Sequence, residues 1–264
     1  MNTALALPRQ ERFFVATSLG GLALLAWIYT AYEARRMNLS GVCECMRMKM
    51  SGPDFSNWPG TILLPLFLMW SIMMVAMMLP SAMPMILTFA AVSRNRQRLG
   101  RAYTSMSIFV AGYFVIWFGF SVLAALTQWW LHRTALLSSS MSATNTLLGG
   151  GLLLAAALFQ FTPLKRACLT HCRGPLEFIM TRWRDGNGGA FKMGLNHGAY
   201  CTGCCWALMA LLFVAGVMNI LWIAALTLLV CSEKMLPAPN WVRAISGLTL
   251  AIWGICVLAQ PLLS

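Results

Sequence analysis

The sequence predicts an all-α protein, a polytopic bundle of about seven transmembrane helices that forms a single integral membrane domain over residues 1–264. Of the 264 residues, 59% are hydrophobic and only 10% are charged, which is more apolar material than a soluble domain of this size needs to bury. The apolar residues also form long runs, and the basic residues lie mostly between those runs, as is typical of membrane proteins.

Seven of these runs are long enough to cross a bilayer, whose hydrocarbon core of about 30 Å takes about 20 helical residues. Most of the 19 lysine and arginine residues lie before the first span, in the connections after the second and fourth spans, or around the turn between the sixth and seventh. The positive-inside rule therefore places the N-terminus in the cytoplasm and the C-terminus outside. The predicted spans are 13–31, 62–91, 104–131, 144–163, 197–216, 218–236 and 242–260.

Charge, the length of the first apolar run and cysteine content argue against three other assignments. These are a nucleic-acid-binding protein, a cleaved signal peptide and a disulfide framework. A net charge of +12 would suggest nucleic acid in a soluble protein, but here the basic residues flank spans, so we expect a lipid bilayer as partner and no nucleic acid. The run 13–31 is too long for a signal-peptide core and no convincing cleavage site follows it. The nine cysteines do not indicate a disulfide framework, because most lie inside or beside spans.

The segment 32–61, between the first two spans, is predicted to be an outer loop rich in cysteine and methionine. It contains VCECMRMKM, in which soft ligands nearly alternate with charged residues. Thiolate and thioether groups favour Cu(I), and methionine in an exposed, charged loop has no core to fill. A flexible loop that is methionine-rich without binding metal is the alternative. The candidate ligands here are Cys43, Cys45, Met46, Met48 and Met50.

The second span combines methionines at helical spacing with two prolines. Met73 and Met77 are four residues apart, which suits either a soft-metal path or a simple packing stripe. Pro80 and Pro84 each deprive a carbonyl four residues earlier of its helical partner, for example that of Ala76. In lipid such carbonyls must face protein or a polar cavity, so we expect the break to point inward and the methionines to lie on its outer side.

The third and fourth spans carry no recognisable chemistry, but the connection 164–196 that follows does. It is predicted to be cytoplasmic and to begin with a short helix over 163–173, because Thr162 precedes Pro163 as a helix start and Gly174 precedes a proline as a stop. This helix bears Cys168 and Cys172 on one face.

The fifth span opens with MGLNHGAYCTGCCWALM, the densest group of metal-ligating side chains in the chain. On a helix, Cys201 and Cys204 lie about 40° and 20° to either side of His197. Cys205 is about 80° away and joins that face only with an adjustment. One face therefore carries an imidazole and two thiols, which is half of a metal site.

The other half is expected from the short helix. Cys168 and Cys172 are again four residues apart, with His171 beside them, and two such pairs of soft ligands complete a four-coordinate site. Glu233, at the inner end of the sixth span, is either an acceptor that orients a metal-bound imidazole or the partner of a nearby lysine or arginine.

Four separated motifs carry a family resemblance: MMVAMMLPSAMPM, TPLKRACLTHCRGPLEF, GLNHGAYCTGCCWALMALLFVAGVMN and EKMLP. Through them, residues 62–240 resemble a bacterial family of predicted metal-binding integral membrane proteins of unknown function, some of which are labelled copper chaperones. The resemblance implies a multi-pass protein of the bacterial inner membrane. It includes the cysteines of the short helix and fifth span, His197 and Glu233 in the family pattern, but not Cys43 and Cys45.

The leading hypothesis is a protein that handles copper. Cu(I) would be gathered by the outer loop, pass along the methionines of the second span, and be held by the inner cysteine and histidine cluster before delivery to a soluble metal-binding protein. Zn(II) is the alternative metal for the inner cluster, because tetrahedral cysteine and histidine sites also hold structural zinc.

Two other functions stay open on the same residues. One is a membrane thiol–disulfide oxidoreductase that uses Cys201 and Cys204. The other is an assembly factor in which a structural metal joins the short helix to the fifth span. The sequence lacks carboxylate pairs, Ser/His/Asp arrangements and nucleotide motifs, which argues against hydrolase and NTP-driven activity. A binding protein is favoured over an enzyme, with the oxidoreductase left open.

Overall fold

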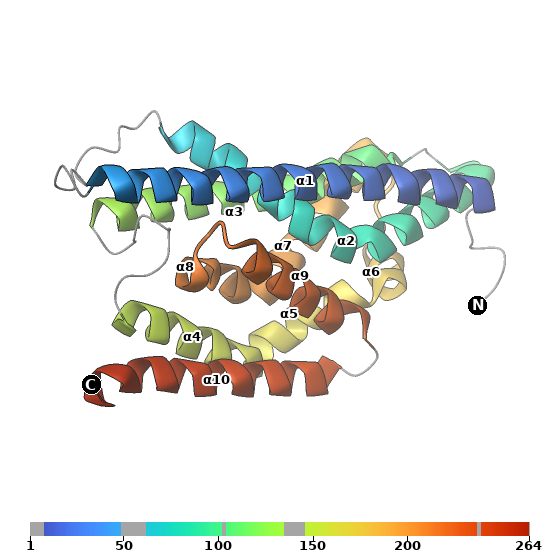
Figure 1. Ribbon diagram of the computed structural model, residues 1–264. Helices are drawn as coiled ribbons and strands as arrows, with labels where there is room; N and C mark the ends of the chain where they lie inside the picture. The colour runs from blue at the N-terminus through green and yellow to red at the C-terminus, as the bar shows by residue number, and fades with distance from the viewer. Residues whose placement is uncertain (1–7, 49–61, 102–103, 135–145, 237–238, 264) are drawn as a thin grey trace.

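The structure, a computed structural model, describes residues 8–48, 62–101, 104–134, 146–236 and 239–263. Within these ranges every regular element is a helix (Figure 1), which confirms the all-α class. The helices are α1 (Arg9–Met48), α2 (Leu63–Arg98), α3 (Met106–Arg133), α4 (Thr146–Phe161), α5 (Pro163–Arg173), α6 (Pro175–Arg182), α7 (Gly186–Ala210), α8 (Leu212–Ala215), α9 (Ile220–Met235) and α10 (Pro239–Leu263).

Five segments in the described residues are long and apolar enough to cross a membrane, and a sixth is added if α4 and α5, which meet at 65°, form one bent span. Helix α9 has 16 residues, fewer than the about 20 that a perpendicular span requires. The membrane-protein class therefore agrees with the structure, while seven spans and their orientation stay predictions. The five segments are Arg9–Arg36, Leu63–Arg98, Met106–Arg133, Gly186–Ala215 and Asn240–Gln260.

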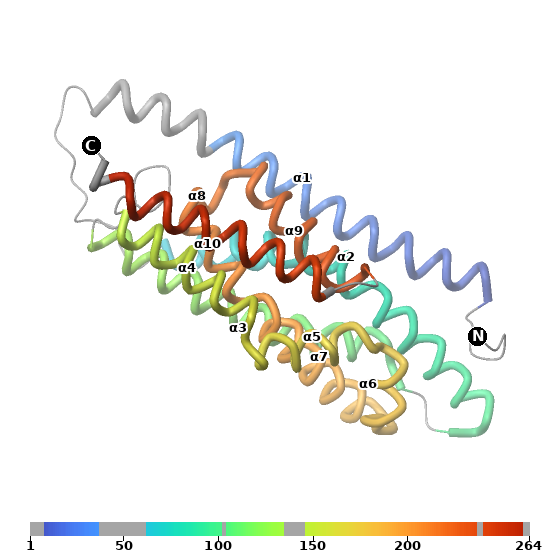
Figure 2. Tube along the Cα trace, turned by 90° about the horizontal axis from the view of Figure 1, so that it is seen from below, coloured from blue at the N-terminus to red at the C-terminus, as the bar shows by residue number. Residues whose placement is uncertain are grey.

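The helices form a bundle with α1 along one edge and α10 along the opposite edge (Figure 1). Helix α1 packs on α2, α3 packs on α7, and α4 packs on α10, with α5 and α9 between these pairs. Figure 2 shows that α6 and the first part of α7 lie at the same end of the bundle as the start of α1 and the end of α2. The short helix α6 therefore lies at one end of the long helices.

Helix α1 is longer than expected. It continues to Met48, so residues 32–48 extend the first helix instead of forming part of a loop. The apolar run does stop near Ala31, but the following residues are mostly strong helix formers such as alanine, glutamate, arginine and methionine, and no proline interrupts them. Helical propensity therefore carries the helix beyond the end of its apolar run.

The proline break in α2 is satisfied by protein, as predicted. The carbonyl oxygen of Ala76, four residues before Pro80, accepts a hydrogen bond from Trp27 Nε1 of α1 at 3.0 Å. The expected outward position of the methionines is wrong, because Met73 and Met77 are fully buried. Since α1, α3 and α9 all contact α2, both sides of the break face protein.

Helices α3 and α7 approach each other at glycines, and this contact places the site. A Cβ at Gly194 would overlap the Phe109 carbonyl oxygen, and a Cβ at Gly112 would overlap that of Phe191. At Gly198 a Cβ would lie 2.9 Å from the Tyr113 carbonyl oxygen. Small residues that let backbones touch are typical of membrane helix pairs. The contact brings the polar end of the Tyr113 side chain to the cysteine-bearing turn of α7.

Candidate metal centre

Helix α5 begins and ends where the sequence predicted. The Thr162 side chain accepts a hydrogen bond from the Lys165 backbone N–H at 3.2 Å, Pro163 is the first helical residue, and Gly174 follows the last. This capping satisfies backbone donors at the helix start. Because α5 packs directly on α7, its cysteines face the cysteine-bearing turns of that helix.

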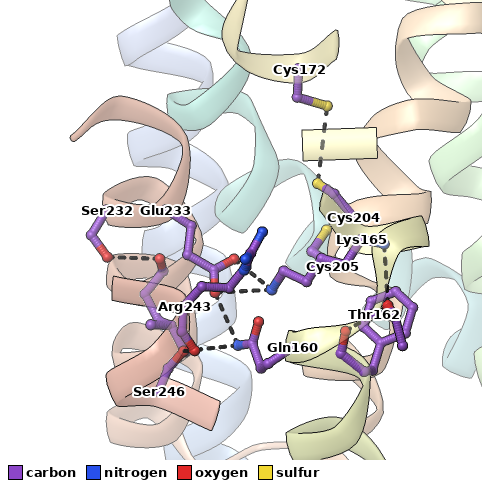
Figure 3. Close-up of polar contacts among 12 residues, drawn as sticks. Gln160, Thr162, Lys165, Cys172, Cys204, Cys205, Ser232, Glu233, Arg243 and Ser246 are labelled. Atoms are coloured by element: carbon purple, nitrogen blue, oxygen red, sulfur yellow. Dashed lines mark hydrogen bonds and ion pairs between the residues drawn. The ribbon is translucent and has the colours of Figure 1, made fainter. Parts of the chain in front are cut away.

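The two predicted halves of the site do meet. Cys172 Sγ of α5 lies 4.0 Å from Cys204 Sγ of α7 (Figure 3). The thiols of Cys204 and Cys205 each donate to the carbonyl oxygen of Cys201, both at 3.0 Å. Cys201, Cys204 and Cys205 are almost completely buried, whereas Cys172 is half-buried. We call Cys172, Cys201, Cys204 and Cys205 the thiol cluster.

Cys168 also reaches α7, one turn before Cys172. Its Sγ lies 2.9 Å from the position that a Cβ would take at Gly203, which is closer than real Cβ contacts allow. The absence of a side chain at Gly203 therefore gives Cys168 its place against α7. This role of Gly203 was not predicted, because it depends on a neighbour 35 positions earlier in the chain.

The two histidines have different positions. His197 is buried, with its ring stacked on those of Tyr113 and Phe109 at centroid distances of 5.4 and 6.1 Å. Its Nδ1 has no hydrogen-bond partner among the described residues, so this atom is available to a ligand. His171 instead stacks on Tyr200 at 4.4 Å, and its Nδ1 lies 2.9 Å from the Ala167 carbonyl oxygen. That nitrogen of His171 is thus engaged by its own helix.

Cys201 has two polar partners that the sequence did not indicate. Lys234 Nζ lies 2.9 Å from Cys201 Sγ and 3.1 Å from Ser81 Oγ. Tyr113 Oη lies 3.2 Å from the same sulfur. These groups come from α9, α2 and α3, so the sulfur of Cys201 is held by an ammonium and a phenol supplied by distant parts of the chain. The sequence signals were the place of Lys234 in the EKMLP motif of the family resemblance and, for Tyr113, a polar group within an apolar run.

Glu233 takes the second of its two expected roles. Its carboxylate lies 2.7 Å from Lys165 Nζ of α5 and also accepts from Gln160 Nε2 at 3.0 Å (Figure 3). Lys165 and Glu233 are 0% and 2% exposed, and Gln160 donates further to Ser246 of α10. This buried ion pair joins α5 to α9, and the expected contact of Glu233 with an imidazole is replaced by the contact with Lys165.

The remaining predicted ligands lie elsewhere. Met73 and Met77 are buried in α2. Cys43, Cys45, Met46 and Met48 fall in the last turns of α1, and Met50 lies outside the described residues. Within the described ranges, the structure contains no preformed group of three or more His, Cys, Asp or Glu side chains that could hold a metal ion. Cys172 and Cys204 therefore form a contact between two thiols. The thiols of Cys201 and Cys205 belong to the same turns of α7 as Cys204.

Comparison with known proteins identifies the family but no individual relative. No curated protein and no solved structure matches the chain. The family model for PpoB2, described as a copper chaperone, matches residues 67–257. This match extends from α2 into α10 and includes the whole thiol cluster, while the segment with Cys43 and Cys45 lies outside it. The chain therefore belongs to the PpoB2 family, which is described as a copper chaperone.

Proposed function

We propose that the protein holds Cu(I) as cargo between α5 and α7 and passes it to a partner. The observation that supports this most directly is the 4.0 Å separation of Cys172 Sγ and Cys204 Sγ. Two sulfur ligands at about 2.3 Å from one ion lie no more than about 4.6 Å apart. A separation of 4.0 Å corresponds to a sulfur–metal–sulfur angle of about 120°. Thiolate ligands favour Cu(I) over hard cations, and the family description names copper and not zinc.

The surrounding groups divide into fixed and accessible ligands. Cys201 and Cys204 are buried in α7, where Tyr113 and Lys234 hold the first of them. Cys168 and Cys172 are half-buried on α5, so they are the thiols that a soluble partner can reach. Transfer would then exchange a sulfur ligand of this chain for a thiolate of the partner, with the copper remaining Cu(I) throughout.

The membrane setting of the proposal follows from the charges. Helix α6, which directly follows α5 in the chain, lies at the same end of the bundle as the start of α1 and the end of α2 (Figure 2), where Arg9, Arg96 and Arg98 lie. By the positive-inside rule we assign this end to the cytoplasmic side of a bacterial inner membrane. The metal partner would then be a soluble cytoplasmic protein.

A competition titration tests the cargo site. The copper-free protein in lipid nanodiscs is titrated with Cu(I), under reducing and oxygen-free conditions, against a coloured Cu(I) chelator. We expect Cys172→Ser and Cys204→Ser to weaken Cu(I) binding by at least about 100-fold, the upper end of what loss of an outer-shell partner costs. Cys256→Ser is the matched control, since Cys256 is exposed on α10. Equal Cu(I) affinity in all four proteins would refute the site.

A thiol–disulfide oxidoreductase is the second candidate, and the contact of Lys234 with Cys201 favours it. A thiolate is the nucleophile in disulfide exchange, and nearby cations favour it. In this case the Cys201 thiolate would attack a disulfide of a partner protein, which forms a mixed disulfide and releases one partner thiolate. Cys204 would then attack the Cys201 sulfur and displace the second partner thiolate, so that α7 gains a disulfide and the partner's disulfide is reduced. A Cys204→Ser variant would then accumulate a mixed disulfide through Cys201. A Cu(I) chaperone would show no such trapped species.

A further inference from the structure

A cavity lies on the side of α5 that faces away from the thiol cluster. It has a volume of about 320 Å³ and is bounded by α5, the start of α6 and the first turns of α10. Arg166, Thr170 and Arg173 line it from α5, at a spacing of four and three residues that forms one helical stripe. Cys168 and Cys172 lie on the opposite face of the helix, so this cavity is separate from the thiol cluster.

The cavity is strongly basic. Three guanidinium groups line it, from Arg166, Arg173 and Arg243, against one carboxylate, that of Glu177. Arg173 also donates to the Leu236 carbonyl oxygen, which holds its side chain at this place. Glu233, which does not line the cavity, attracts Arg243 electrostatically but is shared with Lys165 and Gln160. The lining therefore carries positive charge that its own carboxylates do not balance.

Arg243 independently points to an anion at this place. Its side chain is 6% exposed, and its Nε is buried without a hydrogen-bond partner among the described residues. A buried charged donor that lacks a partner is costly, and three guanidinium groups around one cavity repel each other. An anion bound between them removes both costs.

The chemistry of the lining specifies the anion. Guanidinium groups recognise the oxygens of phosphate through paired hydrogen bonds, and the hydroxyl of Thr170 and the amide of Asn240 add further donors. The candidate span of α10 begins at Asn240, which puts the cavity at the depth of lipid headgroups. Trp241 beside it is 74% exposed, as expected of an aromatic anchor at the membrane interface.

We propose that this cavity is a phosphate-binding site, filled by the headgroup of an anionic phospholipid or by free phosphate. Both ligands offer the same oxygens to Arg166, Arg173 and Arg243. A site of this kind would join the first turns of α10 to the arginine-bearing face of α5 through one bound anion. It is independent of copper, because no residue of the thiol cluster lines it.

Two binding measurements distinguish the ligands. In the first, protein from nanodiscs that contain phosphatidylcholine and phosphatidylglycerol is analysed by native mass spectrometry for retained phosphatidylglycerol. In the second, protein in pure phosphatidylcholine nanodiscs is dialysed against radiolabelled inorganic phosphate. Retention of phosphatidylglycerol alone would support the headgroup as ligand, and binding in the dialysis would support free phosphate.

The test variant is Arg166→Gln/Arg173→Gln, which spares the buried Arg243. The matched control is Arg101→Gln/Arg184→Gln, with the same loss of charge at exposed arginines that do not line the cavity. We expect at least about tenfold weaker binding in the test variant and unchanged binding in the control. An unchanged midpoint of thermal unfolding in detergent would show that the test variant is folded. Wild-type protein that binds neither probe, or a test variant that binds both as wild type does, would overturn the proposal.

Discussion

Cys201 is the residue at which three helices meet through polar contacts. A phenol from α3 and an ammonium from α9 approach its sulfur, while its carbonyl oxygen accepts from the thiols of Cys204 and Cys205 within α7. Side chains held in this way lose little further freedom when a ligand binds. The α7 side of the thiol cluster is therefore preorganised, in contrast to the half-buried cysteines of α5.

The ion pair of Lys165 and Glu233 is expected to stabilise the fold only while both partners are present. Lys165→Met leaves the buried carboxylate of Glu233 without its cation, and loss of one partner of a buried pair costs about 3–5 kcal/mol. The double variant Lys165→Met/Glu233→Met buries no charge and should be closer to wild type. Denaturant unfolding in detergent measures these differences.

The control for this pair is Lys192→Met, because Lys192 is an exposed lysine of α7 and should change the free energy of unfolding by less than about 0.5 kcal/mol. A double variant that loses as much stability as Lys165→Met and Glu233→Met lose together would show that the two charges act separately. The sequence indicated that Glu233 was special but not which cation it meets, since Lys165 lies 68 positions away.

At the scale of elements, local signals predicted α5 well and the longer helices less well. Thr162 and Pro163 mark the start of α5, and Gly174 directly follows its last residue. The end of α1 could not be read from the loss of hydrophobicity, because helix formers continue after it. The burial of Met73 was also misjudged, since periodicity shows that a face exists but not which neighbours cover it.

The glycine contact between α3 and α7 is expected to be sensitive to a single methyl group. Gly194→Ala would place a Cβ against the Phe109 backbone, which cannot move as a side chain can, and overpacking of this kind costs about 1–3 kcal/mol. Gly119→Ala, also in α3, is the control because no described atom lies within 4 Å of its Cβ position. Thermal unfolding in detergent should separate the two variants, and equal midpoints would contradict the close contact.

At the scale of the whole molecule, we expect the fold to be independent of copper. The buried side chains of α2, α3 and α7 form a continuous apolar core, and burial of such side chains supplies folding free energy without a bound ion. The copper-free protein should therefore remain folded. Cu(I) at 100 times its dissociation constant should raise the free energy of unfolding by about 2.7 kcal/mol.

This expectation separates a chaperone from an assembly factor with a structural metal. Unfolding is followed by circular dichroism after extraction with a strong Cu(I) chelator, and again after copper is restored. Loss of helical signal on extraction would favour the structural metal, because such sites supply folding free energy directly.

The cysteines of the thiol cluster could be predicted from the sequence, but the residues that contact them could not. Cys172 and Cys204 could be paired in advance because each belongs to a local pattern of soft ligands at helical spacing. Lys234, Tyr113 and Gly203 could not, because their roles arise only where α9, α3 and α5 come against α7. Tertiary packing, which local patterns do not encode, decides which polar atoms surround the sulfur atoms.

The hydrogen bond from Trp27 to the Ala76 carbonyl oxygen also fixes the position of α1 along α2. A helix of 40 residues is about 60 Å long, twice the thickness of the hydrocarbon core of about 30 Å. Fixing Trp27 at the proline break of α2 prevents this rod from sliding along its axis. Because the candidate membrane span of α1 is Arg9–Arg36, the turns that carry Cys43 and Cys45 lie beyond the end of that span.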